Sequence, residues 1–186
     1  MVNMRELWEP ILLSSAGVFI SSAVIWMALG YHKNDAVGVK NEEALRKALK
    51  EQDLAPNQYV IPYCPDQKER ATPEFQQKLK DGPLALLTMR APGVLDMKRM
   101  LGAWFFHLFI VTSIIAYVAG RTLPHGLSFL TIFRAVATIA WLAHAGALPT
   151  ASIFWSRPWR VTWKDVADGL WYACLTGAIF AWLWPR

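Results

Sequence analysis

Residues 11–30, ILLSSAGVFISSAVIWMALG, contain no charged side chain. A helix rises about 1.5 Å per residue, so this run is long enough to cross a hydrocarbon core about 30 Å thick. A cleaved signal peptide is the alternative, because residues 28–30 (ALG) loosely match a small-x-small cleavage site. However, Glu6 and Glu9 accompany Arg5 in the preceding tail, and the run exceeds the usual signal-peptide core of about 7–15 residues. The sequence therefore predicts a retained transmembrane helix at 11–30, after a short outer tail.

Three further apolar runs of membrane-spanning length follow, at 101–120, 127–148 and 163–184. The 186 residues are 54% hydrophobic and include ten Trp, which argues against a soluble domain. The apolar residues are gathered into long runs instead of recurring at amphipathic spacing. The sequence therefore predicts a membrane all-α protein with four transmembrane helices.

One long polar stretch, 31–100, separates the first run from the other three and holds most of the 19 Lys and Arg and of the 14 Asp and Glu. Asn41 is a typical N-cap, and the acid-first i,i+4 pairs after it favour a helix at 41–51. Proline, glycine and β-rich segments predict the other elements, a strand at 58–61, a helix at 73–81 and a strand at 84–89. This small α+β insertion has few elements to build a core, so we expect it to lean on the membrane helices or on a partner.

Positive charge is concentrated on one side of the predicted membrane. Four spans place 31–100 and the link after the third span on the same side. The basic residues near span ends on that side are Lys33, Arg90, Lys98, Arg99, Arg157, Arg160 and Lys164. The other side has only Arg5, Arg121 and Arg186. The positive-inside rule therefore predicts that 31–100 is cytoplasmic and both termini are outside, and the net charge of +5 reflects membrane orientation and not nucleic-acid binding.

Two charged residues lie well inside the predicted spans, away from the span ends, and are candidate binding residues, because a charge in hydrocarbon costs at least a few kcal/mol. Arg134 lies roughly 10 Å from the outer end of the third span, and Asp168 roughly 8 Å from the cytoplasmic end of the fourth. An axial gap of over roughly 10 Å makes a direct pair unfavourable. Arg134 either snorkels to the headgroups or, like Asp168, binds a substrate or partner.

His107 and His144 fall at similar depth in the second and third spans. Two such histidines can ligate a b-type haem between helices, although a lone membrane histidine more often hydrogen-bonds a neighbouring helix. The leading expectation is therefore no cofactor, with haem b as the alternative. Cys64 and Cys174 have no zinc or disulfide spacing and are expected to be free thiols. The sequence contains no recognisable catalytic motif.

Residues 151–164, ASIFWSRPWRVTWK, alternate indole and basic side chains. The residues concerned are Trp155, Arg157, Trp159, Arg160, Trp163 and Lys164. We interpret this link as a lipid-interface segment, with indoles at the headgroup level and cations on anionic lipid phosphates. Thr162, three residues before Asp165, is expected to cap the fourth helix.

Six segments are distributed along most of the length of the chain: MALGYHKND, APNQYVIPYC, GPLALLTMRAPG, VAGRTLP, SIFWSRPW and DGLWYACLTGAIFAWLWP. Together they make the chain resemble a family of small, uncharacterised bacterial integral membrane proteins. The resemblance implies a multi-pass protein of the bacterial inner membrane. It implies no assigned activity and supplies no catalytic residue.

Three functions are compatible with this pattern. The leading hypothesis is a non-enzymatic accessory subunit whose module at 31–100 binds a larger membrane complex or a cytoplasmic protein. The second is a small transporter or channel that uses Arg134 to bind an anion. The third is a haem or quinone redox subunit that uses His107 and His144.

Overall fold

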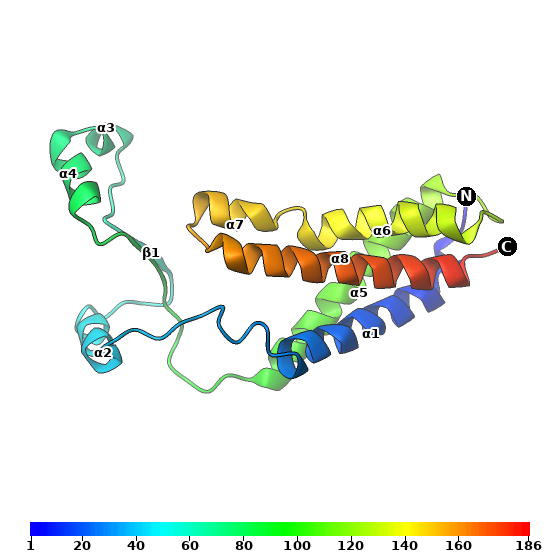
Figure 1. Cartoon of the computed structure of the whole chain (residues 1–186), viewed down its shortest axis with the longest axis horizontal. Helices are drawn as coiled ribbons and strands as arrows, with labels where there is room; N and C mark the ends of the chain where they lie inside the picture. Colours follow the sequence, from blue (N-terminus) through cyan, green and yellow to red (C-terminus); the bar gives the residue numbers. More distant parts are fainter. The chain divides into compact units, whose positions relative to one another are not determined.

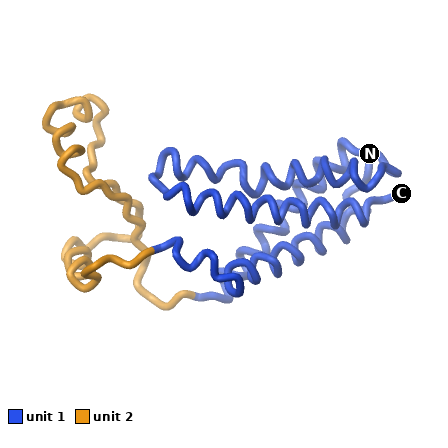
Figure 2. Tube along the Cα trace, viewed as in Figure 1, with its two compact units in different colours: residues 1–36, 96–186 blue, residues 37–95 orange.

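The computed structural model describes all residues, 1–186, and contains two compact units. Unit 1 comprises Met1–Ala36 and Asp96–Arg186, and unit 2 comprises Val37–Leu95 (Figure 2). Unit 1 is helical, whereas unit 2 combines short helices with a two-stranded sheet.

Unit 1 contains four helical segments that are long and apolar enough to cross a membrane. They are Trp8–Ala28, Met97–Thr122, Phe129–Phe154 and Trp159–Leu183. The first consists of α1 (Trp8–Ala23) and a π-helical turn, η2 (Val24–Ala28), and the second is α5 (Met97–Thr122). The third consists of α6 (Phe129–Ala145) and α7 (Leu148–Phe154), and the fourth is α8 (Trp159–Leu183). A 3₁₀ turn, η1 (Met4–Glu6), precedes α1.

The fourth span begins at Trp159, four residues earlier than its composition predicts. Pro158 stands at its N-cap with φ −57°, and the ring-fixed φ of proline favours the start of a helix. Thr162 therefore lies inside the helix, where its buried hydroxyl lies 2.6 Å from Ser152 Oγ. The prediction that Thr162 caps this helix is wrong, and α7 occupies the first part of the expected interfacial link.

The four spans form a closed ring in which α1 packs against α5, α5 against α6, α6 against α8 and α8 against α1 (Figure 1). Their shared core contains the buried side chains of Leu7, Ile115, Ile132, Val136, Ala140 and Phe180. Glycine permits the tightest approach, because a Cβ on Gly177 would stand 2.8 Å from the Ala137 Cβ and one on Gly169 would stand 2.9 Å from the Ala145 Cβ. The α6–α8 interface therefore depends on the absence of side chains at these positions.

The outward faces of the spans are apolar. Large hydrophobic side chains there are strongly exposed, among them Phe106 (63%), Leu142 (59%) and Trp182 (78%). Monomeric soluble proteins rarely expose contiguous apolar surface of this kind, whereas lipid covers it without cost. The apolar outer surface of unit 1 is therefore the kind of surface expected of helices that are long and apolar enough to cross a membrane.

Unit 2 contains α2 (Glu42–Glu51), β1 (Gln58–Ile61), α3 (Gln67–Arg70), α4 (Pro73–Asp81) and β2 (Ala85–Thr88). The strands pair antiparallel, with Gln58 opposite Thr88 and Ile61 opposite Ala85. The side chains of Asn41, Asp66 and Thr72 cap α2, α3 and α4 in turn, which satisfies backbone N–H groups that the first helical turn leaves free. Unit 2 is therefore held together mainly by local helix capping and strand pairing, and only slightly by a buried core.

Candidate functional site

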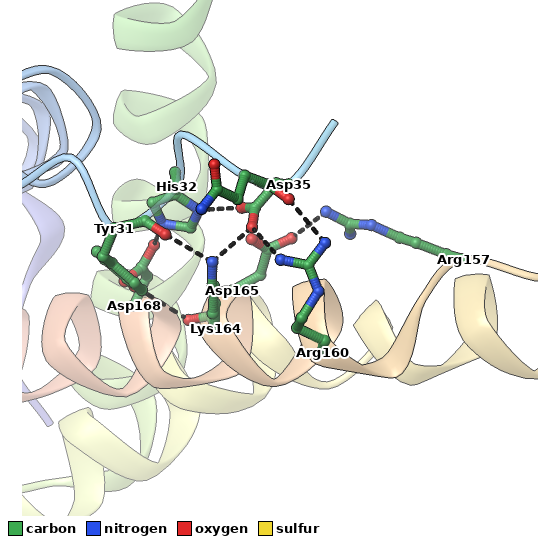
Figure 3. Close-up of polar contacts among 9 residues, drawn as sticks. Tyr31, His32, Asp35, Arg157, Arg160, Lys164, Asp165 and Asp168 are labelled. Atoms are coloured by element: carbon green, nitrogen blue, oxygen red, sulfur yellow. Dashed lines mark hydrogen bonds and ion pairs between the residues drawn. The ribbon is translucent and has the colours of Figure 1, made fainter. Parts of the chain in front are cut away.

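The residues just after the first span lie against the beginning of α8 and form a polar cluster with it (Figure 3). Asp168 is at its centre and is 6% exposed. The Tyr31 hydroxyl donates to Asp168 Oδ1, and the His32 Nε2 atom lies 2.9 Å from Asp168 Oδ2. On its other side the His32 ring contacts Asp35, with 2.5 Å between Nδ1 and Oδ2. His32 is thus held between two carboxylates.

Basic side chains of α8 and the preceding link surround these carboxylates. Lys164 Nζ donates to Asp35 Oδ1 and to the Tyr31 carbonyl, both at 2.6 Å. Arg157 forms an ion pair of 2.5 Å with Asp165, and Arg160 donates to the Asn34 carbonyl at 2.7 Å. These contacts fix the point at which the chain leaves the first span (Figure 3).

Two pKa values outside the spans reflect this environment. The hydrogen bond from Lys164 lowers the pKa of Asp35, and the contact with His32 acts in the same direction. Burial raises the pKa of Tyr31, and its hydrogen bond to Asp168 raises it further. Tyr31 is therefore a protonated donor and Asp35 an ionised acceptor at neutral pH.

The cluster borders a cavity of about 160 Å³. Its lining residues include Trp26, Trp104, His144, Asp165, Asp168 and Tyr172. The Trp26 ring stacks on His32 at a centroid distance of 3.9 Å and 4° between the planes. The stacking on Trp26 and the contacts with the two carboxylates together hold the His32 ring in this orientation.

Of the two charged residues predicted within spans, only Asp168 belongs to the cluster. Arg134 is exposed on α6, and its side chain makes no hydrogen bond or ion pair. The structure therefore does not bring Arg134 and Asp168 together.

The two membrane histidines have different surroundings. His107 is exposed and stacks on Trp104 at 5.5 Å, whereas His144 lines the cavity edge-on to Tyr172 and its Nε2 has no partner. His107 does not line the cavity, whose volume is below the range of about 300–1,000 Å³ that is usual for small-molecule pockets. The structure does not place the two imidazoles on a shared pocket.

The predicted lipid-interface residues divide into two groups. Trp155, Trp159 and Trp163 are exposed at 58%, 46% and 59%, and the last two stack at 5.7 Å. Arg157, Arg160 and Lys164 instead bond to acidic side chains and carbonyls of the cluster. The indoles are thus free to meet lipid, while the cations already have protein partners.

Sequence reasoning did not identify His32, Tyr31, Asp35 or Asp165 as residues of a site. One signal was available. Asp168 is the one acidic residue well inside a predicted span, and the four-span topology places 31–35 on the same side of the membrane as the nearer end of that span. A search for its partner among those residues would have found His32.

Unit 2 has a separate groove of about 750 Å³ between α2 and the end of β2. Its apolar lining comes from Leu49, Leu54, Pro56, Met89 and Pro92. Its charged lining comes from Arg46, Lys47, Lys50 and Arg90, against Glu43 and Asp53. Arg46 and Glu43 pair at 2.9 Å, so the remaining charge of the groove is positive.

The fold and these sites define the class of protein, a helical protein with four helices suited to crossing a membrane and an inserted unit after the first of them. No family model, no curated protein and no solved structure matches the chain.

Proposed function

We propose that the chain is a non-enzymatic, multi-pass membrane protein whose unit 2 binds a protein partner, as an accessory or assembly subunit. One observation carries this proposal. Cys64 is the one buried side chain of unit 2, while Val37, Tyr63 and Leu84 are 82%, 71% and 63% exposed. A unit of this size without a core gains little stability from its own burial. Covering its apolar side chains with a partner would supply the missing burial.

The groove in unit 2 indicates the chemistry of the partner. Part of its lining is apolar, and its free positive charges, from Lys47, Lys50 and Arg90, outnumber the one free negative charge, from Asp53. A segment that presents apolar side chains flanked by Asp or Glu would bury the apolar lining and complement the charge, which favours both specificity and association rate. The proposed partner is therefore a protein with an acidic, amphipathic segment.

Reversing the groove charge is expected to abolish partner binding. We predict that the doubly substituted Lys47→Glu/Lys50→Glu protein, extracted from native membranes in mild detergent, loses the protein that co-purifies with the wild type. Lys78→Glu/Lys80→Glu is the matched control, because these exposed lysines lie on α4 outside the groove. Native mass spectrometry measures the outcome. A wild-type chain that migrates alone, or equal loss from both double variants, would refute the proposal.

We further propose the bacterial inner membrane as the location, with unit 2 in the cytoplasm and both termini outside. The support is the distribution of Lys and Arg and the resemblance described above. Cys64 is only 6% exposed and its thiol donates to the Asp66 carbonyl, so it is a poor reporter of sidedness.

An introduced cysteine tests this orientation. In a Cys64→Ser/Cys174→Ser background, Val94→Cys places a thiol at a position that is 99% exposed in unit 2, and Arg186→Cys marks the C-terminus. We expect a membrane-impermeant maleimide to label Arg186→Cys from outside intact cells, and to label Val94→Cys only after permeabilisation. The opposite labelling pattern would invert the proposed topology.

A further inference from the structure

The geometry points to a divalent transition-metal site formed by His32, Asp165 and Asp168, which goes beyond the proposed partner binding. Each residue offers one ligand atom, and these atoms all lie within 4.8 Å of one another. His32 and Asp168 are buried and Asp165 is half-buried. The closest pair, His32 Nε2 and Asp168 Oδ2, is 2.9 Å apart. Ligand atoms about 2.0–2.2 Å from a shared ion stand only slightly farther apart than this.

The surroundings of His32 match those of a metal-bound histidine. Metal-ligating imidazoles almost always donate their second N–H to a carboxylate or carbonyl, which fixes the tautomer and the ring orientation. Asp35 contacts His32 Nδ1 at 2.5 Å and is itself held by Lys164. Trp26 stacks on the ring with 3.9 Å between the centroids. The lone pair of Nε2 is therefore directed at Asp168.

An independent observation concerns Asp165. Its Oδ2 pairs with Arg157, but its Oδ1 is buried without a hydrogen-bond partner. A buried ionised oxygen without a partner is costly, so native structures usually supply a donor, a water or an ion. A cation between Asp165 and Asp168 satisfies this oxygen.

The two ring nitrogens of His32 also favour a bound cation, because each of them contacts a carboxylate. A neutral imidazole has one N–H and one lone pair, so it donates to one carboxylate only. His32 nevertheless contacts Asp35 and Asp168 at its two ring nitrogens. With a metal ion on Nε2, the neutral ring donates from Nδ1 to Asp35 and both contacts become favourable. The ion then stands where a second ring proton would otherwise be required.

The donor set selects the class of ion. One imidazole nitrogen and two carboxylate oxygens suit Zn²⁺ and its first-row neighbours, whereas Mg²⁺ and Ca²⁺ prefer oxygen alone. The carboxylates of Asp165 and Asp168 supply negative charge to a divalent cation, and Asp165 keeps its ion pair with Arg157 through its other oxygen. Three protein ligands leave a fourth position of a tetrahedral ion open. Zn²⁺ is therefore the probe of choice, and Co²⁺ is its spectroscopic substitute.

Metal titration of the tag-free, full-length protein in detergent tests the site. After treatment with EDTA, we expect one Zn²⁺ per chain and, with Co²⁺, the visible absorption bands of a tetrahedral ion. Asp168→Asn keeps a side chain of the same shape that still bonds Tyr31 and His32, yet removes a charged ligand. It is expected to weaken Zn²⁺ binding at least about tenfold.

A second ligand variant and a control complete the test. Asp165→Asn is expected to weaken Zn²⁺ binding as much as Asp168→Asn does, and gel filtration establishes that each variant is folded. His125→Ala is the control, because this histidine contacts Glu6 and belongs to a different site. Absence of Zn²⁺ binding by the wild type, unchanged binding in both Asp variants, or equal binding of Mg²⁺ would overturn the assignment. These outcomes leave the partner-binding proposal untouched, since its lysines lie in unit 2.

Discussion

Asp168→Ala is expected to lower the free energy of unfolding by about 3 kcal/mol, because it removes a buried carboxylate and leaves the two polar side chains that contact it, Tyr31 and His32, without a partner. The side chains of His32 and Asp168 are only 3% and 8% exposed, and Tyr31 would lose its acceptor as well. For a chain of this length the change corresponds to a melting temperature lower by about 6–12 °C. Thermal unfolding in detergent, followed by circular dichroism in the presence of EDTA, measures it.

Asp168→Asn is the informative comparison for this prediction. The amide oxygen still accepts from the Tyr31 hydroxyl, and the amide nitrogen donates to a neutral His32 ring. We therefore expect less than half of the loss that Asp168→Ala causes. Equal losses for the two substitutions would show that charge, and not hydrogen bonding, holds residues 31–35 against α8. No loss for either would contradict the structural role of the cluster.

Gly177→Val is expected to lower the free energy of unfolding by about 3 kcal/mol, because it inserts bulk where two helices touch. A Cβ at this position would meet the Ala137 Cβ at 2.8 Å and the Phe133 carbonyl oxygen at 3.0 Å. Backbone atoms cannot rotate away, so α6 and α8 must separate, and overpacking of this kind costs about 1–3 kcal/mol or more. The same thermal measurement reports the loss.

Gly102→Val is the matched control for this substitution. Gly102 lies in α5 with nothing within 4 Å of its Cβ position, so the added side chain has free space. We expect its melting temperature to stay close to that of the wild type. A similar loss in both variants would mean that valine acts through helix propensity and not through the α6–α8 contact.

The four spans could be predicted from the sequence, because runs of about 20 apolar residues have few alternatives to a membrane helix. The order of the helices in the ring could not be predicted. An apolar span lacks the contrast between polar and apolar faces that marks the buried side of a soluble helix. The close approach of Gly169 and Gly177 to α6 became visible only in the structure. The start of α8 was also misplaced, since the Trp-rich first turn resembles a lipid-interface link.

The candidate site was predictable only in part. Asp168 was recognised because a carboxylate in an apolar span needs a partner. His32 was missed because its chemistry arises from a contact across 136 positions of sequence. Asp35 was missed because a carboxylate three residues after a histidine is common in exposed loops and does not by itself indicate a contact. The sequence therefore identified only Asp168 of the cluster as a binding residue, and the packing of residues 31–35 on α8 supplied its partners.

Photo-crosslinking from the groove tests partner binding by unit 2 most directly. A photoreactive amino acid at Lys50 lies in the groove, and the same residue at Lys80 lies outside it. In irradiated native membranes we expect a discrete higher-mass adduct with another protein from position 50, and no such adduct from position 80. Adducts from neither position, or equally from both, would contradict the account.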